Sequence, residues 1–335
     1  MSRADSGMKR ESFRARNRKS GGMLLRQEAR QRTGSLLSAL MLFGLCFLII
    51  QPILDKISVS FMQEQDLYDT TIIVVPRHLT TDNYSLAALL LNLNTSMLNT
   101  VLISLLTSIL QITACTLAGY GFARFDFPLK KLWFACVILV IVVPPQTISS
   151  SLYLHFRYYD ILGIMKSLTG GTVNLKGSTL PYLMLSATCM GLKNGLYIFM
   201  IRQYFRAIPK SLEEAAYVDG CSAFGTFARV LLPQAVPILV SCLLFAFVWQ
   251  WTDVFYTRLF LPTANVMYLS IRLSGLAESL RTYLSTRRGI TSPPVGYVMQ
   301  MISTGVLIVT LPLMIIYVFA QKGFIETISS TGIKE

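Results

Sequence analysis

Long apolar runs separated by polar loops constrain this chain more than any other feature. About six runs are each long enough to cross a hydrocarbon core of ~30 Å as an α-helix. Backbone polar groups have no water partners inside a bilayer, so runs of this length fold as helices. Only 14% of the residues are charged, compared with about 25% in soluble domains. The sequence therefore predicts an all-α polytopic protein of the cell membrane.

The predicted transmembrane helices follow one another along the chain. They cover residues 35–54, 98–123, 132–152, 180–201, 235–251 and 296–320. We expect a helix break near the outer end of the third span, because Pro144 and Pro145 disrupt helical hydrogen bonding. Residues 55–97 and 252–295 are expected to be polar loops outside the cell.

Basic residues predict the orientation. The net charge is +13, and the excess is concentrated in an N-terminal arm, residues 1–34, and in short loops. This positive-inside pattern places the N-terminus and the tail, residues 325–335, in the cytoplasm. The arm has no apolar period and is expected to be irregular or to lie on membrane lipid. Since the membrane explains the charge, we expect no nucleic-acid partner.

Residues 203–233, between the fourth and fifth spans, form the most informative polar segment. Ser211 and Glu214 have the spacing of a capping box. Gly220 is placed to end that helix in a left-handed conformation, and Ser222 to cap a second helix running towards Pro233. The mixture of apolar and acidic residues suits a helix that docks into a groove on another protein. A solvated interfacial helix fits the pattern equally well.

A long motif in this segment resembles a known signature. Glu214-Ala215-Ala216, then Gly220 and residues 230–233 (Val-Leu-Leu-Pro), is similar to the EAA motif of ABC-importer permeases, with Val230 where isoleucine is usual. The resemblance implies that this loop docks on a cytoplasmic ATPase subunit, with Glu214 accepting a basic side chain. The implied coupling residues are Ser211, Glu213, Glu214, Ala215, Ala216, Asp219, Gly220, Leu232 and Pro233.

Other stretches extend the resemblance to the carbohydrate-uptake branch of these permeases, typified by a maltose permease subunit. They are residues 118–125 (AGYGFARF), 202–205 (RQYF) and 247–253 (FVWQWTD). The likeness implies the type I importer permease fold within residues 98–324. It also implies three partners: ABC ATPase subunits, a second, homologous permease subunit in a heterodimer, and an extracellular solute-binding protein. The implied cargo is a sugar or oligosaccharide.

Catalytic and cofactor motifs are not found in the sequence. It lacks the glycine-rich loop and lysine that cradle nucleotide phosphates, so we expect ATP hydrolysis on a separate subunit. The six cysteines have no metal-site or disulfide spacing, and we expect no cofactor. Two other functions were weighed: an ion-coupled secondary transporter, which needs buried carboxylates and internal repeats that we do not find, and a membrane scaffold without transport.

Polar residues within the spans are candidates for a translocation path. Lys193 lies nine residues before Arg202, and therefore ~13 Å deeper than the inner interface in a continuous helix. Lys193, with Asn194 beside it, either lines the path or marks a break of the span near Gly191 or Gly195. Three neutral residues either hydrogen-bond a sugar or hold helices together: Asn99, Gln146 and Gln250.

Overall fold

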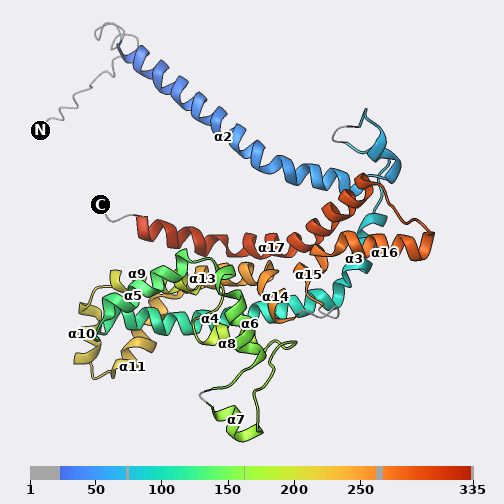
Figure 1. Ribbon diagram of the computed structural model, residues 1–335. Helices are drawn as coiled ribbons and strands as arrows, with labels where there is room; N and C mark the ends of the chain where they lie inside the picture. The colour runs from blue at the N-terminus through green and yellow to red at the C-terminus, as the bar shows by residue number, and fades with distance from the viewer. Residues whose placement is uncertain (1–22, 73–74, 162, 262–266, 333–335) are drawn as a thin grey trace, which may run out of the picture.

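The computed structural model describes residues 23–72, 75–161, 163–261 and 267–332. Residues 1–22 of the N-terminal arm lie outside the described residues. Helices dominate (Figure 1), and the β-structure within these residues is limited to two isolated bridges. The long helices are α2 (Met23–Phe61), α4 (Leu93–Arg124), α5 (Lys130–Val142), α9 (Asn194–Ala207), α13 (Val236–Trp251), α16 (Leu276–Arg288) and α17 (Val295–Gly332). The shorter ones are η1 (Glu64–Tyr68), α3 (Asp82–Leu91), η2 (Pro145–Ile148), α6 (Ser149–Arg157), α7 (Ile164–Thr169), α8 (Leu180–Ala187), α10 (Ser211–Val218), α11 (Ala223–Thr226), the π-helical turn η3 (Phe227–Leu231), α12 (Leu232–Gln234), α14 (Phe255–Phe260) and α15 (Leu269–Ser274).

Membrane-spanning potential is concentrated in α2, α4 and α17. In the described residues these three helices are long and apolar enough to cross a membrane, and two bent helix pairs raise the number to as many as five. The first pair bends by 101° between residues 142 and 145, which confirms the break expected at Pro144 and Pro145. The second pair joins residues 223–234 to α13 with a bend of 73°.

The fourth expected span is not one helix. Residues 180–201 are divided between α8, which ends at Ala187, and α9, which begins at Asn194. Cys189 and Lys193 within the break both have positive φ angles, of 57° and 60°. A left-handed residue cannot continue a right-handed helix, so the apolar run is interrupted.

Two other boundaries differ from those expected. The helix α2 already begins at Met23, within the arm expected to be irregular, and continues to Phe61, beyond the expected end of the first span. The segment 55–97, expected to be a polar loop, contains η1, α3 and the first turn of α4. Apolar sequence therefore underestimates helix length where polar residues extend the same helix past the membrane.

The body of the molecule is built around α4. This helix packs on α9 and α13, and its contact with α9 is close at Gly119. A Cβ at that position would lie 2.9 Å from Ile201 Cγ2, so only glycine lets the two backbones approach in this way. Small hydroxyl residues of α4, including Ser104 and Ser108, are fully buried, and Ser108 donates its hydroxyl to the carbonyl of Ser104 one turn earlier.

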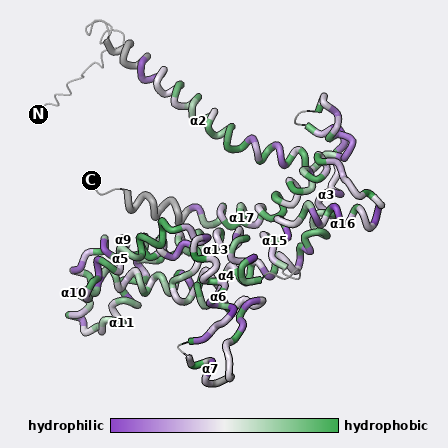
Figure 2. The backbone as a smooth tube through the Cα atoms, viewed as in Figure 1, coloured by the Kyte–Doolittle hydropathy of each residue, from purple (hydrophilic) through white to green (hydrophobic). Residues whose placement is uncertain are grey.

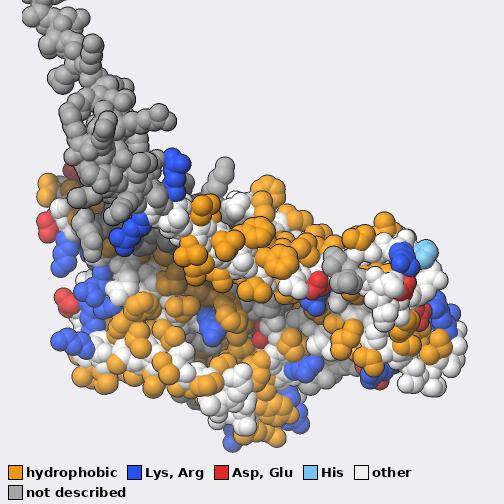
Figure 3. Space-filling model, turned by 90° about the horizontal axis from the view of Figure 1, so that it is seen from above, with side chains coloured by type: hydrophobic (Ala, Val, Ile, Leu, Met, Phe, Trp, Pro, Cys, Tyr) orange, Lys and Arg blue, Asp and Glu red, His pale blue; other side chains and the backbone are white. Residues whose placement is uncertain are grey.

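The helix α2 diverges from this body. Figure 1 shows it leaving the other helices towards the N-terminus and meeting α17 and α3 only near its own C-terminal end. None of the apolar stretch of α2 is buried against the rest of this single chain. Figure 2 shows hydrophilic residues gathered in the segment after α2, and Figure 3 shows apolar side chains over the middle of one face with charged side chains towards both ends. This distribution is the one expected of a membrane-embedded body.

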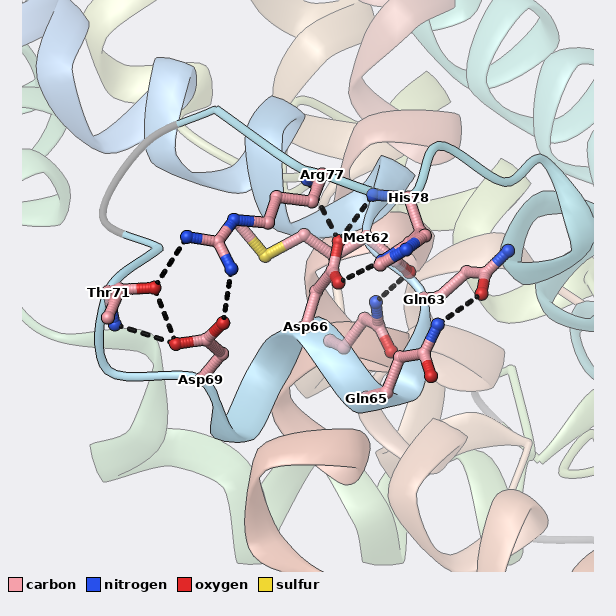
Figure 4. A network of polar contacts seen from close by, with 9 residues as sticks. Met62, Gln63, Gln65, Asp66, Asp69, Thr71, Arg77 and His78 are labelled. Carbon is pink, nitrogen blue, oxygen red and sulfur yellow. Dashed lines mark hydrogen bonds and ion pairs between the residues drawn. The ribbon is translucent and has the colours of Figure 1, made fainter.

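The segment between η1 and α3 is held by a carboxylate (Figure 4). Asp66 is buried and accepts from the backbone N–H groups of Arg77 and His78, at 3.0 and 2.8 Å. Its other oxygen lies 2.7 Å from Nδ1 of the His78 ring. Nearby, Asn83 and Gln300 each donate to the carbonyl of Met62, which ties α3 and α17 to the end of α2. The Met62 carbonyl thus joins these three helices, and Asp66 fixes the segment that follows η1.

Acid is expected to loosen the segment that Asp66 holds between η1 and α3. The His78 side chain, followed by its backbone N–H, lowers the pKa of Asp66 below its ordinary value. A lowered folded-state pKa contributes stability that is present above the unfolded pKa, at about pH 4, and is lost as the pH falls further. The protection factors of the amides in residues 62–80, which are exchange rates corrected for the intrinsic pH dependence, should therefore fall more steeply between pH 5 and 3 than those of Asp66→Asn. Parallel profiles for the two proteins would contradict this role for Asp66.

Candidate functional site

The helix α10 begins without the expected capping box. Lys210 occupies the N-cap position with φ and ψ of −65° and −25°, and no side-chain cap is formed. The backbone N–H groups of Glu213 and Glu214 bond to the Lys210 carbonyl, at 2.9 and 3.0 Å. Since Lys210 is already helical, Ser211 lies inside the first turn, where its hydroxyl does not reach the free N–H groups. The capping-box prediction was therefore wrong.

The end of α10 confirms the other two local predictions. Gly220 has a φ angle of +80°, and the N–H groups of Gly220 and Cys221 donate to the carbonyls of Tyr217 and Ala216. This pair of bonds is a Schellman motif. Ser222 then caps α11, its Oγ accepting from Gly225 N at 3.2 Å. The second helix continues through η3 and α12 to Gln234.

A buried ion pair joins α10 to the end of α4. Glu213 Oε1 lies 2.5 Å from Arg124 Nε, and both side chains are about nine-tenths buried. Arg124 also donates from Nη2 to the carbonyl of Ile208, at 2.9 Å. The guanidinium of Arg124 thus contacts both Ile208, which precedes α10, and Glu213 in its first turn. The pair therefore fixes the first turn of α10 to the last turn of α4.

Aromatic contacts strengthen the same junction. The ring of Tyr120 on α4 lies 5.4 Å from Phe205 on α9 and 4.5 Å from Phe227 in η3, measured between centroids. Tyr204 donates its hydroxyl to the carbonyl of Gln234, at 2.6 Å. These contacts connect α9, η3 and α12, so the segment from α10 to α12 is packed onto the helical body as one unit.

The opposite face of α10 is exposed. Glu214, Ala215 and Asp219 are solvent-exposed, whereas Ala216 packs inwards. Two large apolar side chains beside them are also open, Val218 at 87% and Phe224 at 76% exposure. Three further residues of the implied coupling set are also exposed: Ser211, Gly220 and Pro233. Leu232 is half-buried, and Glu213 is buried in its ion pair. We call this acidic and apolar face of α10 and α11 the docking face.

A second feature is an open cleft of about 460 Å³ at the break between α8 and α9. Gln146 of η2 and Lys193 line it together with Trp249 and Thr252 at the end of α13. Lys193 Nζ lies 4.9 Å from the centre of the Trp249 ring. Of the five residues proposed for a translocation path, the structure brings Gln146 and Lys193 into this cleft.

The other three residues lie outside this cleft. Asn194 is buried and accepts from Gln111 Nε2, which also donates to the carbonyl of Leu192. Asn99 donates to the carbonyl of Met267, at 3.2 Å. Gln250 is buried beside a void of about 10 Å³, which is the size of one water molecule. For Asn99 and Asn194 these contacts are those of residues that hold segments together.

Sequence reasoning did not single out Arg124 or Asp253. Arg124 lies within the stretch 118–125, which contributed to the resemblance, but the resemblance gave this residue no role. Asp253 accepts from the backbone N–H groups of Tyr256 and Thr257, and thereby caps α14. Within the residues that the structure describes, no group of three or more histidine, cysteine or acidic side chains is placed to hold a metal ion.

Comparison with protein families decides the class. The family described as "Binding-protein-dependent transport system inner membrane component" matches residues 111–326, from the middle of α4 into α17. The chain belongs to this family. It is thus a multi-pass permease component of a membrane transport system, and the matched region contains both the docking face and the cleft.

Two relatives and one solved structure illustrate the relationship. The osmoprotective compounds uptake permease protein GgtD of Synechocystis sp. is 34% identical over 183 residues, covering 54% of this chain and only 56% of GgtD. The arabinooligosaccharides transport system permease protein AraQ of Halalkalibacterium halodurans is 25% identical over 311 residues, covering 91% and 99%. The crystal structure of a bacterial ABC transporter involved in the import of the acidic polysaccharide alginate matches 88% of this chain and 97% of its own, with a TM-score of 0.68 and 17% identity. That likeness concerns the fold, which is the ABC importer permease fold.

Proposed function

We propose that this chain is one of two permease subunits of an ATP-driven, binding-protein-dependent importer. The partner permease completes the pore, a solute-binding protein delivers the cargo, and separate ATPase subunits supply the energy. The observation that carries the proposal is the docking face: an exposed acidic and apolar helix surface whose other side is fixed to α4 by a buried ion pair.

The docking face has the properties of a surface that binds another protein and moves with it. Exposed apolar side chains such as Val218 and Phe224 supply area that a partner groove buries. The exposed carboxylate of Glu214 supplies a charge for a basic side chain of the ATPase. Because Glu213 and Arg124 connect α10 to α4, movement of an ATPase subunit reaches the helices of the body as a rigid-body displacement.

Relatives favour a carbohydrate cargo. AraQ carries the name of an arabinooligosaccharide transporter, and a trehalose transport system permease protein, SugB of Mycobacterium tuberculosis, is 23% identical over 283 residues. We therefore propose a sugar or oligosaccharide as the solute. The extracellular binding protein is expected to contribute most of the selection among such solutes.

Co-purification tests this assignment. The full chain, tagged and extracted in mild detergent, should retain an ABC ATPase and a second permease-like chain in stoichiometric amounts. A chain in which Val218 and Phe224 are both replaced by aspartate should keep the second permease but lose the ATPase, because only the docking face has changed. A wild-type chain that purifies without any ATPase, as a secondary transporter would, contradicts the proposal.

A further inference from the structure

A lysine without a carboxylate partner lies in the cleft. Among the ion pairs between described residues, none involves Lys193. Its ammonium group instead lies over the exposed ring of Trp249. An aromatic face is a weaker partner for a cation than a desolvated carboxylate. The donors of Lys193 therefore stay available to a stronger acceptor.

The depth of Lys193 makes this exposure unusual. The helix α9 is continuous from Asn194 to Ala207, so Lys193 lies ~13 Å along the axis from Arg202, at ~1.5 Å per residue. A lysine this far from the helix end at the membrane surface is costly unless it faces water or a partner. The open cleft supplies the water-accessible volume that its position requires.

The acidic residue of the cleft does not neutralise Lys193. Asp253 lines the same space but is buried, and both of its oxygens are used. One oxygen accepts from Tyr256 N at 3.2 Å, and the other from Thr257 N at 2.9 Å and from the Tyr182 hydroxyl at 3.3 Å. The carboxylate thus binds the first turn of α14 and forms no ion pair with Lys193.

The backbone fixes the lysine in this place. Lys193 has a φ angle of +60°, a conformation that is unfavourable for a residue with a Cβ. Its carbonyl accepts from Leu196 N at 3.0 Å, which starts α9. Such strain persists where the surrounding structure determines it and is common at ligand sites. The break between α8 and α9 therefore leaves this side chain exposed in the cleft.

We propose that the cleft binds an anionic group of the transported solute, such as the carboxylate of an acidic sugar. Lys193 supplies the charge, the Trp249 ring supplies a stacking face for the sugar, and the Gln146 amide supplies a hydrogen bond. Binding moves the ammonium of Lys193 from the aromatic ring to the anion. This inference rests on the proposed function, because it assumes that the solute passes along this chain.

Thiol labelling tests the charge of the cleft without knowledge of the cargo. Thr252→Cys, at an exposed position that also lines the cleft, is introduced into the full chain, which is purified in nanodiscs with the subunits that accompany it. Labelling of Cys at that position by an anionic and a cationic methanethiosulfonate is followed by mass spectrometry of its peptide. The anionic reagent should react faster, and the ratio of the two rates should fall about tenfold in Lys193→Met. The ratio should be retained in Lys193→Arg and in the control Lys130→Met, because Lys130 lies at the start of α5, outside the cleft lining, and pairs with Asp126.

Protection distinguishes a solute from a lipid headgroup. At equal millimolar concentration, galacturonate should slow labelling more than galactose does, and this difference should disappear in Lys193→Met. Equal effects of the two sugars, including no effect, would overturn the proposal. So would labelling that slows when anionic lipid replaces zwitterionic lipid, because a headgroup would then be the ligand. A cysteine that neither reagent modifies would show that the cleft is closed to solutes.

The two proposals fail in different ways. Labelling and protection report on the cleft and need no ATPase, whereas co-purification reports on the docking face. A chain that retains its ATPase but shows no preference for the anionic reagent keeps its function as an importer subunit and loses only the assignment of an anionic solute.

Discussion

Replacing Glu214 with arginine is expected to reduce ATP-driven uptake by the assembled transporter at least a hundredfold. The side chain is exposed on α10, next to Val218, so the substitution leaves the helical body unchanged. A carboxylate facing a basic group becomes a like-charge pair, which costs several kcal/mol at an interface, and ~2.7 kcal/mol already corresponds to a hundredfold. Uptake of labelled solute into proteoliposomes, together with ATPase activity, measures the effect.

Asp126→Arg is the matched control for this substitution. Asp126 lies between α4 and α5, its side chain is 98% exposed, and the charge change is the same. It is not part of the docking face, so uptake should stay within about twofold of the wild type. Both variants should insert into the membrane in normal amounts. Wild-type uptake by Glu214→Arg would remove α10 from the coupling mechanism, and equal losses in both variants would point to general electrostatics.

The membrane class and the main helices were predictable from the sequence because each depends on local composition. The apolar runs at α2, α4 and α17 and the break at Pro144 and Pro145 follow from properties of the residues themselves. Gly220 and Ser222 were likewise recognisable, because the left-handed C′ position and the N-cap strongly favour these residue types.

The sequence left open whether Lys193 marks a break of the fourth span near Gly191 or Gly195 or lines the path, and the structure shows the break. Residues 180–201 are apolar enough for one helix, and the break depends on Cys189 and Lys193 adopting left-handed conformations that neither residue type favours. Tertiary contacts produce this outcome. At Gly195 an added Cβ would lie 2.8 Å from the carbonyl oxygen of Val137, so α9 starts where α5 allows its close approach.

The roles of neighbouring acidic residues were also not separable by sequence. Glu213 and Glu214 are adjacent, and consecutive residues on an α-helix point ~100° apart. Which of them is buried depends on where Arg124 lies, and that depends on how α4 ends. The motif groups both residues, whereas the structure gives Glu213 an internal anchoring position and leaves Glu214 on the docking face.

Removing the carboxylate of Glu213 is expected to lower the stability of the folded protein more than the other proposed substitutions. Glu213→Ala leaves the guanidinium of Arg124 buried without its carboxylate, and a broken buried pair typically costs about 3–5 kcal/mol. Unfolding by SDS in mixed micelles measures this loss. The control is Glu278→Ala, which removes an exposed contact of 3.7 Å with Arg281 and should cost less than about 1 kcal/mol.

A double substitution separates the charge from the contact itself. Arg124→Leu combined with Glu213→Leu removes both charges and keeps apolar side chains at the junction, so it should recover most of the stability lost in Glu213→Ala. It should not recover uptake, because Arg124 also holds the carbonyl of Ile208 at the entry to α10. A stable transporter that hydrolyses ATP without uptake would then place this junction in the transmission of force from α10 to α4. A double variant less stable than Glu213→Ala would instead mean that the hydrogen bond from Arg124 to the Ile208 carbonyl contributes more to stability than the neutralisation of a buried charge.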